Sequence, residues 1–166
     1  MKDLKALFLS FKYALEGIFS TILSERNMRI HIVCMIYMYS FLTLTDWFVL
    51  SRSDWAILFI ANAIVVMGEL INTAIESAVD LATDEIKPLA KKAKDAAAGA
   101  VLVGAIFAVC TGVAILLQKE AFIKLYSYFS SHIFSLIAFI VSFILASIFM
   151  LKGFPKSKKS KKEKTR

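Results

Sequence analysis

The chain of 166 residues lacks most of the marks of a soluble enzyme. It has only two cysteines, Cys34 and Cys110, and both lie inside apolar runs without a CxxC or Cys/His spacing. Neither a disulfide framework nor a zinc site is therefore supported. The usual nucleotide signatures are missing too, because the sequence has no GxxxxGK(S/T) loop, no GxGxxG motif and no kinase-type catalytic loop.

What the chain has instead is apolar sequence. Hydrophobic residues make up 58% of it and its mean hydropathy is +0.69, whereas an ordinary soluble domain is about half apolar even when glycine is counted. This composition predicts a membrane protein, and the length leaves little room for a separate soluble catalytic domain. A nucleotide site would then have to be built from helices at the membrane surface.

The first 24 residues could be mistaken for a signal peptide, but Lys12 and Glu16 interrupt the apolar positions and no small-residue cleavage motif follows. The apolar residues recur at spacings of three and four, which places them on one face of a helix. They are Leu4, Leu7, Phe8, Phe11, Leu15, Ile18, Phe19 and Ile22. The pattern predicts an amphipathic helix over residues 1–24 that lies in the membrane interface.

Four later runs are long enough to cross, or nearly cross, a hydrocarbon core of about 30 Å, which takes about 20 helical residues. They cover about residues 30–50, 55–72, 96–117 and 132–151. The sequence therefore predicts an all-α integral membrane helical bundle, in which an amphipathic surface helix precedes four transmembrane spans.

Basic residues are distributed unevenly around these spans. All of the 20 lysines and arginines except Arg52, Lys119 and Lys124 lie before the first span, between the second and third, or after the fourth. The positive-inside rule then predicts that both termini and the loop 80–94 face the cytoplasm, in a bacterial cell membrane that the chain crosses several times. We expect the basic tail 152–166 to be a solvated charge run that contacts anionic lipid. Nucleic acid is not an expected partner, because no aromatic or folded element accompanies the lysines.

A polar stripe continues the second span. Glu69, Asn72, Glu76 and Asp80 are separated by three, four and four residues, so at about 100° per residue they occupy about 80° of arc on one helical face. A charged group near hydrocarbon is costly and normally faces a partner, a cavity or water. The stripe favours a polar site at the cytoplasmic end of the bundle, although a helix that simply emerges into water would also carry such residues.

Two more polar clusters lie at the same membrane level in this topology. Residues 24–31 (SERNMRIH) join the surface helix to the first span, and residues 91–95 (KKAKD) lead into the third. Carboxylates from two helices and lysines from another can hold a Mg²⁺-bound polyphosphate. The lysines alone would also serve as topological anchors.

These residues resemble a known family. The segment ELINTAIE (69–76), the pair Val79-Asp80 and the segment AKDAAAGAV (93–101) are similar to the signature of the small prokaryotic diacylglycerol kinases and their undecaprenol kinase relatives. The resemblance covers about residues 8–117 and includes Phe11, Tyr13, Ala14, Gly17, Glu25, Asn27, Arg29 and His31. It implies a homotrimeric membrane kinase domain over residues 1–117 that moves the γ-phosphate of ATP onto a lipid hydroxyl. The acceptor would be diacylglycerol, giving phosphatidic acid, or undecaprenol, giving undecaprenyl phosphate.

The resemblance also implies roles for single residues. Glu69 would be the catalytic base, and Glu25 and Glu76 would hold Mg²⁺ on the ATP phosphates. Catalytic and phosphate contacts would include Asn72, Lys94 and Asp95. The residues implied to bind the ATP cofactor are Tyr13, Glu25, Glu76, Asp84, Glu85, Lys87, Lys94 and Asp95.

The chain departs from the family in two places. Lys87-Pro88 stands where many relatives have His-Pro, so a lysine would meet a phosphate there as a point charge. The family usually ends after three spans, whereas a loop from residue 118 and a fourth span, together 118–151, follow here. The simplest place for that span is the periphery of the trimer.

Other functions remain open at this point. An ion- or proton-translocating membrane protein is the competing class, because intramembrane carboxylates also mark ion paths. The polar groups gather at one membrane face, however, and none lies deep in the third or fourth span. A catalytically inactive assembly protein is a third alternative, which the retention of every motif carboxylate disfavours. Within the kinase family, the arrangement ERNMRIH looks more like the undecaprenol-using branch, and the acceptor stays open.

Overall fold

The computed structural model describes residues 2–83, 85 and 87–152, and this part of the chain forms six α-helices without a strand. The helices are α1 (Lys2–Ser24), α2 (Arg26–Leu44), α3 (Arg52–Ala82), α4 (Pro88–Leu116), α5 (Lys119–Ser131) and α6 (Ile133–Lys152). The prediction of an all-α fold is confirmed. Asp84 and the basic tail beyond Lys152 lie outside the described residues.

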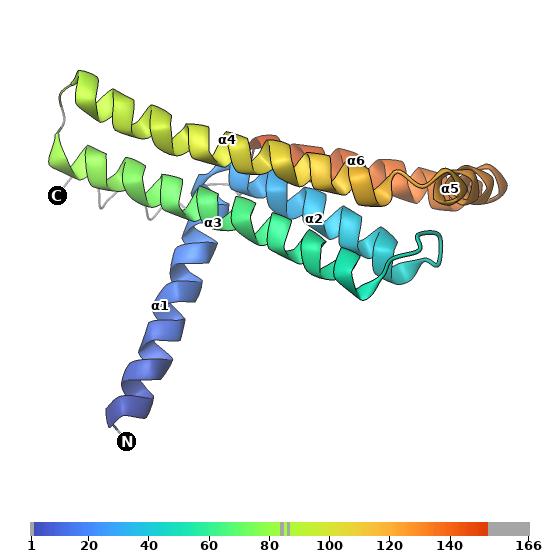
Figure 1. Ribbon diagram of the computed structural model, residues 1–166, viewed down its shortest axis with the longest axis horizontal. Coiled ribbons are helices and arrows are strands. Elements are labelled where there is room, and N and C mark those ends of the chain that lie inside the picture. The colour runs from blue at the N-terminus through green and yellow to red at the C-terminus, as the bar shows by residue number, and fades with distance from the viewer. Residues whose placement is uncertain (1, 84, 86, 153–166) are drawn as a thin grey trace.

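The helices α3 and α4 make the most extensive contact of the molecule and run side by side as a hairpin (Figure 1). Glycines lie where they meet: a Cβ on Gly68 would be 3.6 Å from Val101 Cγ2, and one on Gly104 would be 3.6 Å from Ile64 Cγ2. Small residues let helix backbones approach closely in lipid, where packing rather than water exclusion holds helices together. This hairpin is the frame that carries the polar stripe.

The start of α3 precedes the span expected at 55–72, and its end lies well beyond it. Ser51 and Asp54 form a capping box: the Ser51 hydroxyl accepts from the backbone N–H of Asp54, and the Asp54 carboxylate accepts from the backbone N–H of Ser51 at 2.7 Å. This reciprocal bonding satisfies donors that a helix N-terminus leaves unpaired. The helix therefore begins at Arg52 rather than at the first apolar run.

The span expected at 30–50 is wrong at its C-terminal end. The helix α2 stops at Leu44, and residues 45–50 connect to α3 without helix. The Thr45 hydroxyl donates to the carbonyl of Phe41 at 2.6 Å, which pairs one of the carbonyls that a helix C-terminus leaves without an intrahelical partner. The apolar residues Phe48, Val49 and Leu50 thus belong to a connection, not to a span.

The helices after residue 117 extend the bundle. The expected fourth span is present as α6, which packs against α2, whereas residues 119–131, expected as part of a loop, form α5 (Figure 1). Figure 1 shows α5 end on, so it lies across the end of the bundle. It is fastened there by Gln118, whose side chain exchanges hydrogen bonds of 3.0 and 2.9 Å with the backbone of Val49.

Arg29, near the start of α2, joins the ends of two other helices. Its guanidinium is 5% exposed and donates to the carbonyls of Leu23 (3.0 Å) and Ile22 (3.4 Å) in the last turn of α1, and to the carbonyl of Met150 (3.4 Å) in the last turn of α6. The last carbonyls of a helix lack intrahelical partners and carry partial negative charge. A buried cation at this point therefore stabilises the convergence of α1, α2 and α6.

Four described helices are long and apolar enough to cross a membrane: α1, α3, α4 and α6. The helix α2, with 19 residues including Arg26 and Arg29, is not among them. The helix α1 projects from the side of the bundle at a steep angle, whereas α2 runs alongside α3 and α6 (Figure 1). The location of α1 in the membrane interface stays a prediction, which this direction supports.

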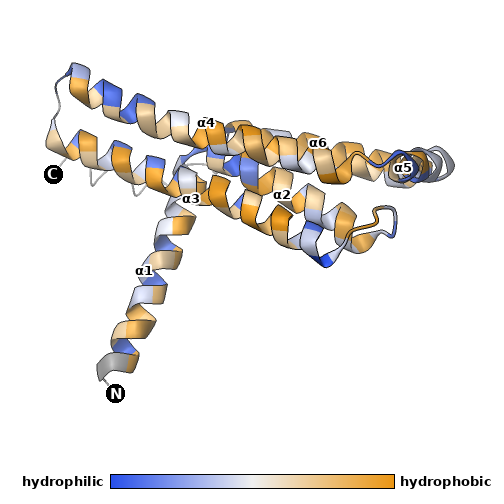
Figure 2. Cartoon of the chain, viewed as in Figure 1, coloured by the Kyte–Doolittle hydropathy of each residue, from blue (hydrophilic) through white to orange (hydrophobic). Residues whose placement is uncertain are grey.

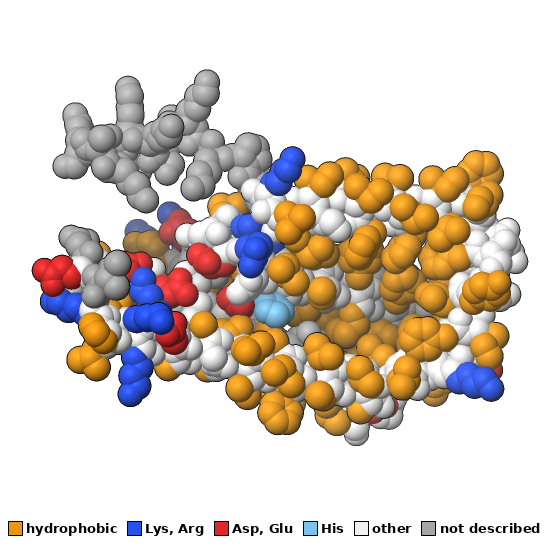
Figure 3. Space-filling view, turned by 90° about the horizontal axis from the view of Figure 1, so that it is seen from above, with side chains coloured by type: hydrophobic (Ala, Val, Ile, Leu, Met, Phe, Trp, Pro, Cys, Tyr) orange, Lys and Arg blue, Asp and Glu red, His pale blue; other side chains and the backbone are white. Residues whose placement is uncertain are grey.

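The two ends of the bundle differ in chemistry. Hydrophilic residues concentrate along the hairpin arm where α3 ends and α4 begins, while the rest of the bundle is largely apolar (Figure 2). The space-filling view shows the same division, with charged side chains gathered over one end (Figure 3). We call the end built from residues 21–31 and 69–95 the polar end, and the end built from residues 41–50 and 118–135 the aromatic end.

Candidate active site

Two polar side chains of the stripe are buried inside the bundle. Glu69 is 2% exposed and Asn72 is 8% exposed, both on the face of α3 that meets the neighbouring helices. Glu69 Oε1 and Asn72 Oδ1 accept no hydrogen bond from any described residue. Buried polar atoms are nearly always paired, so two adjacent open acceptors indicate a place where a ligand supplies the partner.

These acceptors line a cavity of about 240 Å³ at the polar end. Asn27 and His31 face it from α2, Glu69 and Asn72 from α3, and small or apolar residues such as Ala98 from α4. His31 Nε2 lies 3.4 Å from Glu69 Oε1 without the geometry of a hydrogen bond. Asn72 Nδ2 donates to Glu76 Oε1 at 3.0 Å, which turns the Asn72 oxygen away from Glu76.

Glu25 and Glu76 flank this cavity. Both are half-buried, and their charges are the ones that act on Glu69. Among the described residues no three His, Cys, Asp or Glu side chains come together as a ready metal site. Mg²⁺ does not need one, because it usually takes one or two carboxylates and completes its shell with water and substrate phosphates. The donor set therefore fits Mg²⁺ brought in with a polyphosphate.

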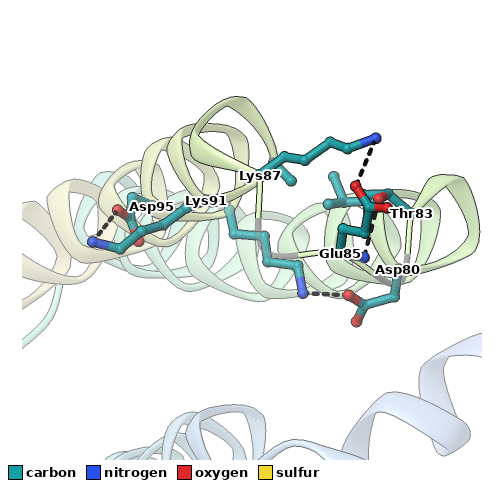
Figure 4. A pocket seen from close by; sticks show the side chains of 9 residues that line it. Asp80, Thr83, Glu85, Lys87, Lys91 and Asp95 are labelled. Atoms are coloured by element: carbon teal, nitrogen blue, oxygen red, sulfur yellow. Dashed lines mark hydrogen bonds and ion pairs between the residues drawn. The ribbon is translucent and has the colours of Figure 1, made fainter.

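A second cavity, of about 380 Å³, lies farther along the hairpin arm (Figure 4). Asp80, which lines it, follows Glu69 by about three helical turns, roughly 16 Å of helix. The other lining residues are Val79, Thr83, Glu85, Lys87, Ala90, Lys91, Lys94 and Asp95. The predicted nucleotide residues Glu85, Lys87, Lys94 and Asp95 are thus brought to one place.

Each lysine of this second cavity faces a carboxylate. Lys87 Nζ is 3.4 Å from Glu85 Oε2, Lys91 Nζ is 3.9 Å from Asp95 Oδ2, and Lys94 donates to Asp80 Oδ1. Figure 4 shows these pairs around the opening. Pairs as exposed as these add little stability, so their ammonium groups can be redirected to a phosphate at small cost.

Two predicted residues are not joined to these cavities. Tyr13 is 63% exposed on α1 and lines neither cavity, because α1 leads away from the bundle. Asp84 lies outside the described residues. Glu25, Glu69, Asn72, Glu76, Glu85, Lys87, Lys94 and Asp95 all lie at the polar end.

The structure also shows contacts of residues that the sequence placed in the polar clusters without giving them a role. His31 and Asn27 face the buried glutamate, and Asp80 and Lys91 pair with predicted residues. Asn27 and His31 are four residues apart and therefore share one helical face, which was a signal available in the sequence. The pairing of α2 with α3 was not.

Comparison with known proteins agrees with this geometry. The sequence profile described as "Prokaryotic diacylglycerol kinase" matches residues 12–116. The chain is 43% identical over 119 residues to an undecaprenol kinase of Bacillus subtilis, which covers 70% of this chain and 93% of that protein. It is 40% identical over 112 residues to a diacylglycerol kinase of Synechocystis, covering 67% of this chain and 62% of that protein. A diacylglycerol kinase of Helicobacter pylori is 34% identical over 106 residues, 64% of this chain and 80% of that protein.

No solved structure matches the chain significantly. The matched residues end with α4, so α5 and α6 lie beyond the family profile. Both cavities at the polar end lie inside the matched region. This chain therefore belongs to the prokaryotic diacylglycerol kinase family and is a multi-pass membrane lipid kinase.

Proposed function

We propose that this kinase transfers the γ-phosphoryl group of ATP to the hydroxyl of a long-chain polyprenol of the undecaprenol type, at the cytoplasmic face of the membrane. The observation that carries the proposal is the buried pair Glu69 and Asn72, whose open oxygens face a cavity between three helices. A carboxylate in such a place can receive the proton of an alcohol that enters from the membrane.

In this mechanism Glu69 is the base. The acceptor oxygen bonds to the γ-phosphorus, the bond between that phosphorus and the β–γ bridging oxygen breaks, the hydroxyl proton passes to Glu69, and ADP leaves. His31 Nε2 lies 3.4 Å from Glu69 Oε1, within ion-pair distance, and limits where the carboxylate can move. Phosphoryl transfer depends mostly on positioning and charge neutralisation, so one base and several charged contacts suffice.

The remaining polar residues bind the nucleotide. Glu25 and Glu76 would hold Mg²⁺, which supplies positive charge against the phosphates when it is bound. Lys94 contacts the phosphates, Asp95 orients Lys91 towards them across 3.9 Å, and Asn72 keeps Glu76 in place through its 3.0 Å hydrogen bond. The second cavity on the hairpin arm receives the rest of the nucleotide, with Lys87 as a further phosphate contact.

The preference for a polyprenol rests on two supports. The relative of Bacillus subtilis, similar along nearly its whole length, is named for undecaprenol. An apolar cavity of about 370 Å³ adjoins the Glu69 cavity, with Ile30, His31 and Ala105 in both linings, and continues between α2, α3 and α4 beside Cys34, Met35 and Met38. One cavity of about 370 Å³ suits a single isoprenoid chain better than the two acyl chains of diacylglycerol.

A competition assay tests the acceptor. Purified enzyme with Mg²⁺ and radiolabelled ATP is given undecaprenol or diacylglycerol in the same lipid mixture, and kcat/KM is compared. We expect undecaprenol to be favoured by about tenfold or more, a discrimination typical of apolar binding pockets. A kcat/KM for diacylglycerol that equals or exceeds it would overturn the acceptor but not the kinase reaction.

A separate variant tests the base. We expect Glu69→Gln to lower kcat by about 10³-fold, within the range for removal of a general base, while the protein still inserts and binds ATP. Glu120→Gln, which changes an exposed glutamate at the start of α5, is the matched control. Full activity in Glu69→Gln would remove this residue from the mechanism.

The assembly is proposed to be a trimer with both termini in the cytoplasm. Large apolar residues of α4 are exposed in the single chain, among them Leu102, Ile106, Phe107, Val109 and Val113. Faces of this kind contact lipid or further copies of the chain. Chemical cross-linking in native membranes would show a trimer ladder, and protease protection of tagged termini would report their side.

A further inference from the structure

The helix α6, which lies beyond the family profile, contacts α2 at three levels along its length. At the polar end Arg29 donates to the Met150 carbonyl at 3.4 Å. Midway, the hydroxyls of Tyr37 and Ser142 are 2.9 Å apart, and the Tyr37 ring meets Phe139 edge to face at 5.9 Å. The positions of α2 and α6 relative to each other are therefore defined along much of their length.

The third level, at the aromatic end, is a cluster of aromatic rings that covers the end of the α2–α6 pair. Trp47 from the connection meets Tyr128 and Phe129 of α5, with centroids 5.3 and 6.5 Å apart, and Phe129 meets Phe139 of α6 at 5.4 Å. Such pairs contribute beyond the apolar area they bury. The aromatic cluster and the midway contact fix the positions of α2 and α6, so the space between these helices has a defined shape.

That space is a cavity of about 840 Å³ between α2, α5 and α6. Ligand sites commonly have about 300–1,000 Å³ and mostly apolar walls with a few polar groups. Here the walls are Phe41, Leu44, Trp47, Phe129 and Phe139, with hydroxyls such as that of Ser40 between them. No lining residue is shared with the cavities of the polar end.

The depth of this cavity matches one membrane leaflet. Its lining on α2 runs from Ile36 to Leu44, which is about 12 Å at the helical rise of 1.5 Å per residue. Half of a hydrocarbon core of about 30 Å is about 15 Å. Ile36 is 59% exposed and Leu44 is 82% exposed, so the cavity is open towards the membrane along this length. A lipid tail can enter it from the side.

Both signs of charge lie at the mouth of the cavity. Asp46 lines it, is exposed, and makes no ion pair with any described residue. Lys124 Nζ donates to the backbone carbonyl of Asp46 at 3.3 Å. The ammonium group of Lys124 therefore lies next to the residue that carries the carboxylate. A phospholipid whose head group bears an amine and a phosphate complements this pair.

We propose that this cavity binds one phospholipid with a primary-amine head group, from the leaflet opposite the active site. One tail lies between α2 and α6, the ammonium faces Asp46 and the phosphate faces Lys124. The site is formed by the helices beyond the family profile together with α2, so it is additional to the kinase reaction.

Trp47 allows a direct test because it lies at the mouth and the chain has only one other tryptophan, Trp55, which stacks on Tyr39 of α2. Trp55→Phe protein is placed in phosphatidylglycerol vesicles with rising fractions of acyl-brominated phosphatidylethanolamine or, for reference, acyl-brominated phosphatidylglycerol. Bromine quenches tryptophan on contact. We expect half-maximal quenching at about threefold lower mole fraction for the amine lipid, a difference within the range for exposed charge pairs.

Three further variants in the same background separate the site from general lipid contact. Asp46→Asn and Lys124→Gln should each abolish the preference, while Lys119→Gln, a control on the first residue of α5, should keep it. Equal quenching curves in the parent protein, or an unchanged preference in both site variants, would overturn the proposal. The measurement needs neither ATP nor an acceptor alcohol, so its outcome is independent of the proposed reaction.

Discussion

The pair α3–α4 and the pair α2–α6 are held together in different ways. The first packs along its length through glycine and alanine, with Gly68 against Val101 and Gly104 against Ile64. The second is joined at separate levels by the Arg29 guanidinium, by one hydroxyl pair and by aromatic rings. Small-residue packing brings the backbones of α3 and α4 close together around Gly68 and Gly104, and a cavity opens between them only farther along, among charged side chains. Joining at intervals instead leaves a mostly apolar cavity between α2 and α6.

This difference follows the boundary of the family. Residues 12–116, which match the family profile, include the whole α3–α4 hairpin and its buried polar groups, whereas α6 lies beyond them. The start of α2 touches both pairs, because Arg29 contacts α6 while Asn27 and His31 line the cavity of Glu69 and Asn72. The added span is thus connected to the site through a single helical turn.

After the loss expected for Glu69→Gln, the next largest effect comes from the neighbouring carboxylate on the polar face of the α3–α4 pair. Glu76→Gln removes a carboxylate proposed to hold Mg²⁺ and weakens the acceptor of the Asn72 hydrogen bond. We expect kcat at fixed Mg²⁺ to fall by about 100-fold, as for residues that orient metal ligands, and to recover in part at higher Mg²⁺. Steady-state kinetics over a Mg²⁺ series measures this, with Glu16→Gln on the exposed face of α1 as control. An unchanged Mg²⁺ requirement would contradict the role.

The packing of the α3–α4 pair gives the next largest effect. A Cβ on Gly68 meets Val101 at ordinary contact distance, so Gly68→Ala should be tolerated, but the branched side chain of Gly68→Leu would push α4 away. We expect Gly68→Leu to lower the free energy of unfolding by about 2–3 kcal/mol, as overpacking does. Denaturation in mixed detergent measures it. Gly112→Leu is the control, because nothing lies within 4 Å of its Cβ position, and an equal loss there would show that contact with α4 is not the cause.

Substitution of Arg29 tests the first turns of α2, which contact both helix pairs. Arg29→Met keeps much of the side-chain volume but leaves carbonyls of α1 and α6 without their donor. We expect a loss of about 2 kcal/mol in unfolding free energy, typical of hydrogen bonds from a charged group. Kinase activity should fall as well, because Asn27 and His31 lie on the same turn. Arg26→Met, at an exposed position, is the control; if both variants behave alike, the junction does not depend on Arg29.

Much of the fold was readable because hydrophobic periodicity and length decide where helices lie. The boundaries were not. The pattern Ser51-x-x-Asp54 starts α3 before its apolar run, which is a local cause, and α2 ends at Leu44 although apolar residues follow it. The helix α5 was missed because Lys119, Glu120 and Lys124 interrupt its apolar positions, and because its contacts with Asp46 and Trp47 join segments that are distant in sequence.

The site shows the same division between local and tertiary information. Helical spacing put Glu69, Asn72 and Glu76 on one face, and that placement needs no partner helix. The contact between His31 and Glu69 depends on how α2 lies against α3, which no local pattern encodes. Tyr13 was expected near the nucleotide. In the structure α1, which precedes the break at Glu25, projects from the bundle, so Tyr13 is exposed and lines neither cavity.

The smallest expected effect concerns the middle contact of the α2–α6 pair. Tyr37→Phe removes the hydroxyl that lies 2.9 Å from Ser142 and keeps the ring against Phe139. Interhelical hydrogen bonds in membranes contribute about 0.6 kcal/mol on average, so we expect a loss of that size and unchanged kcat. Tyr126→Phe, which alters an exposed ring on α5, should change neither. A tenfold fall in activity from Tyr37→Phe would mean that α6 reaches the active site through more than the turn at Arg29.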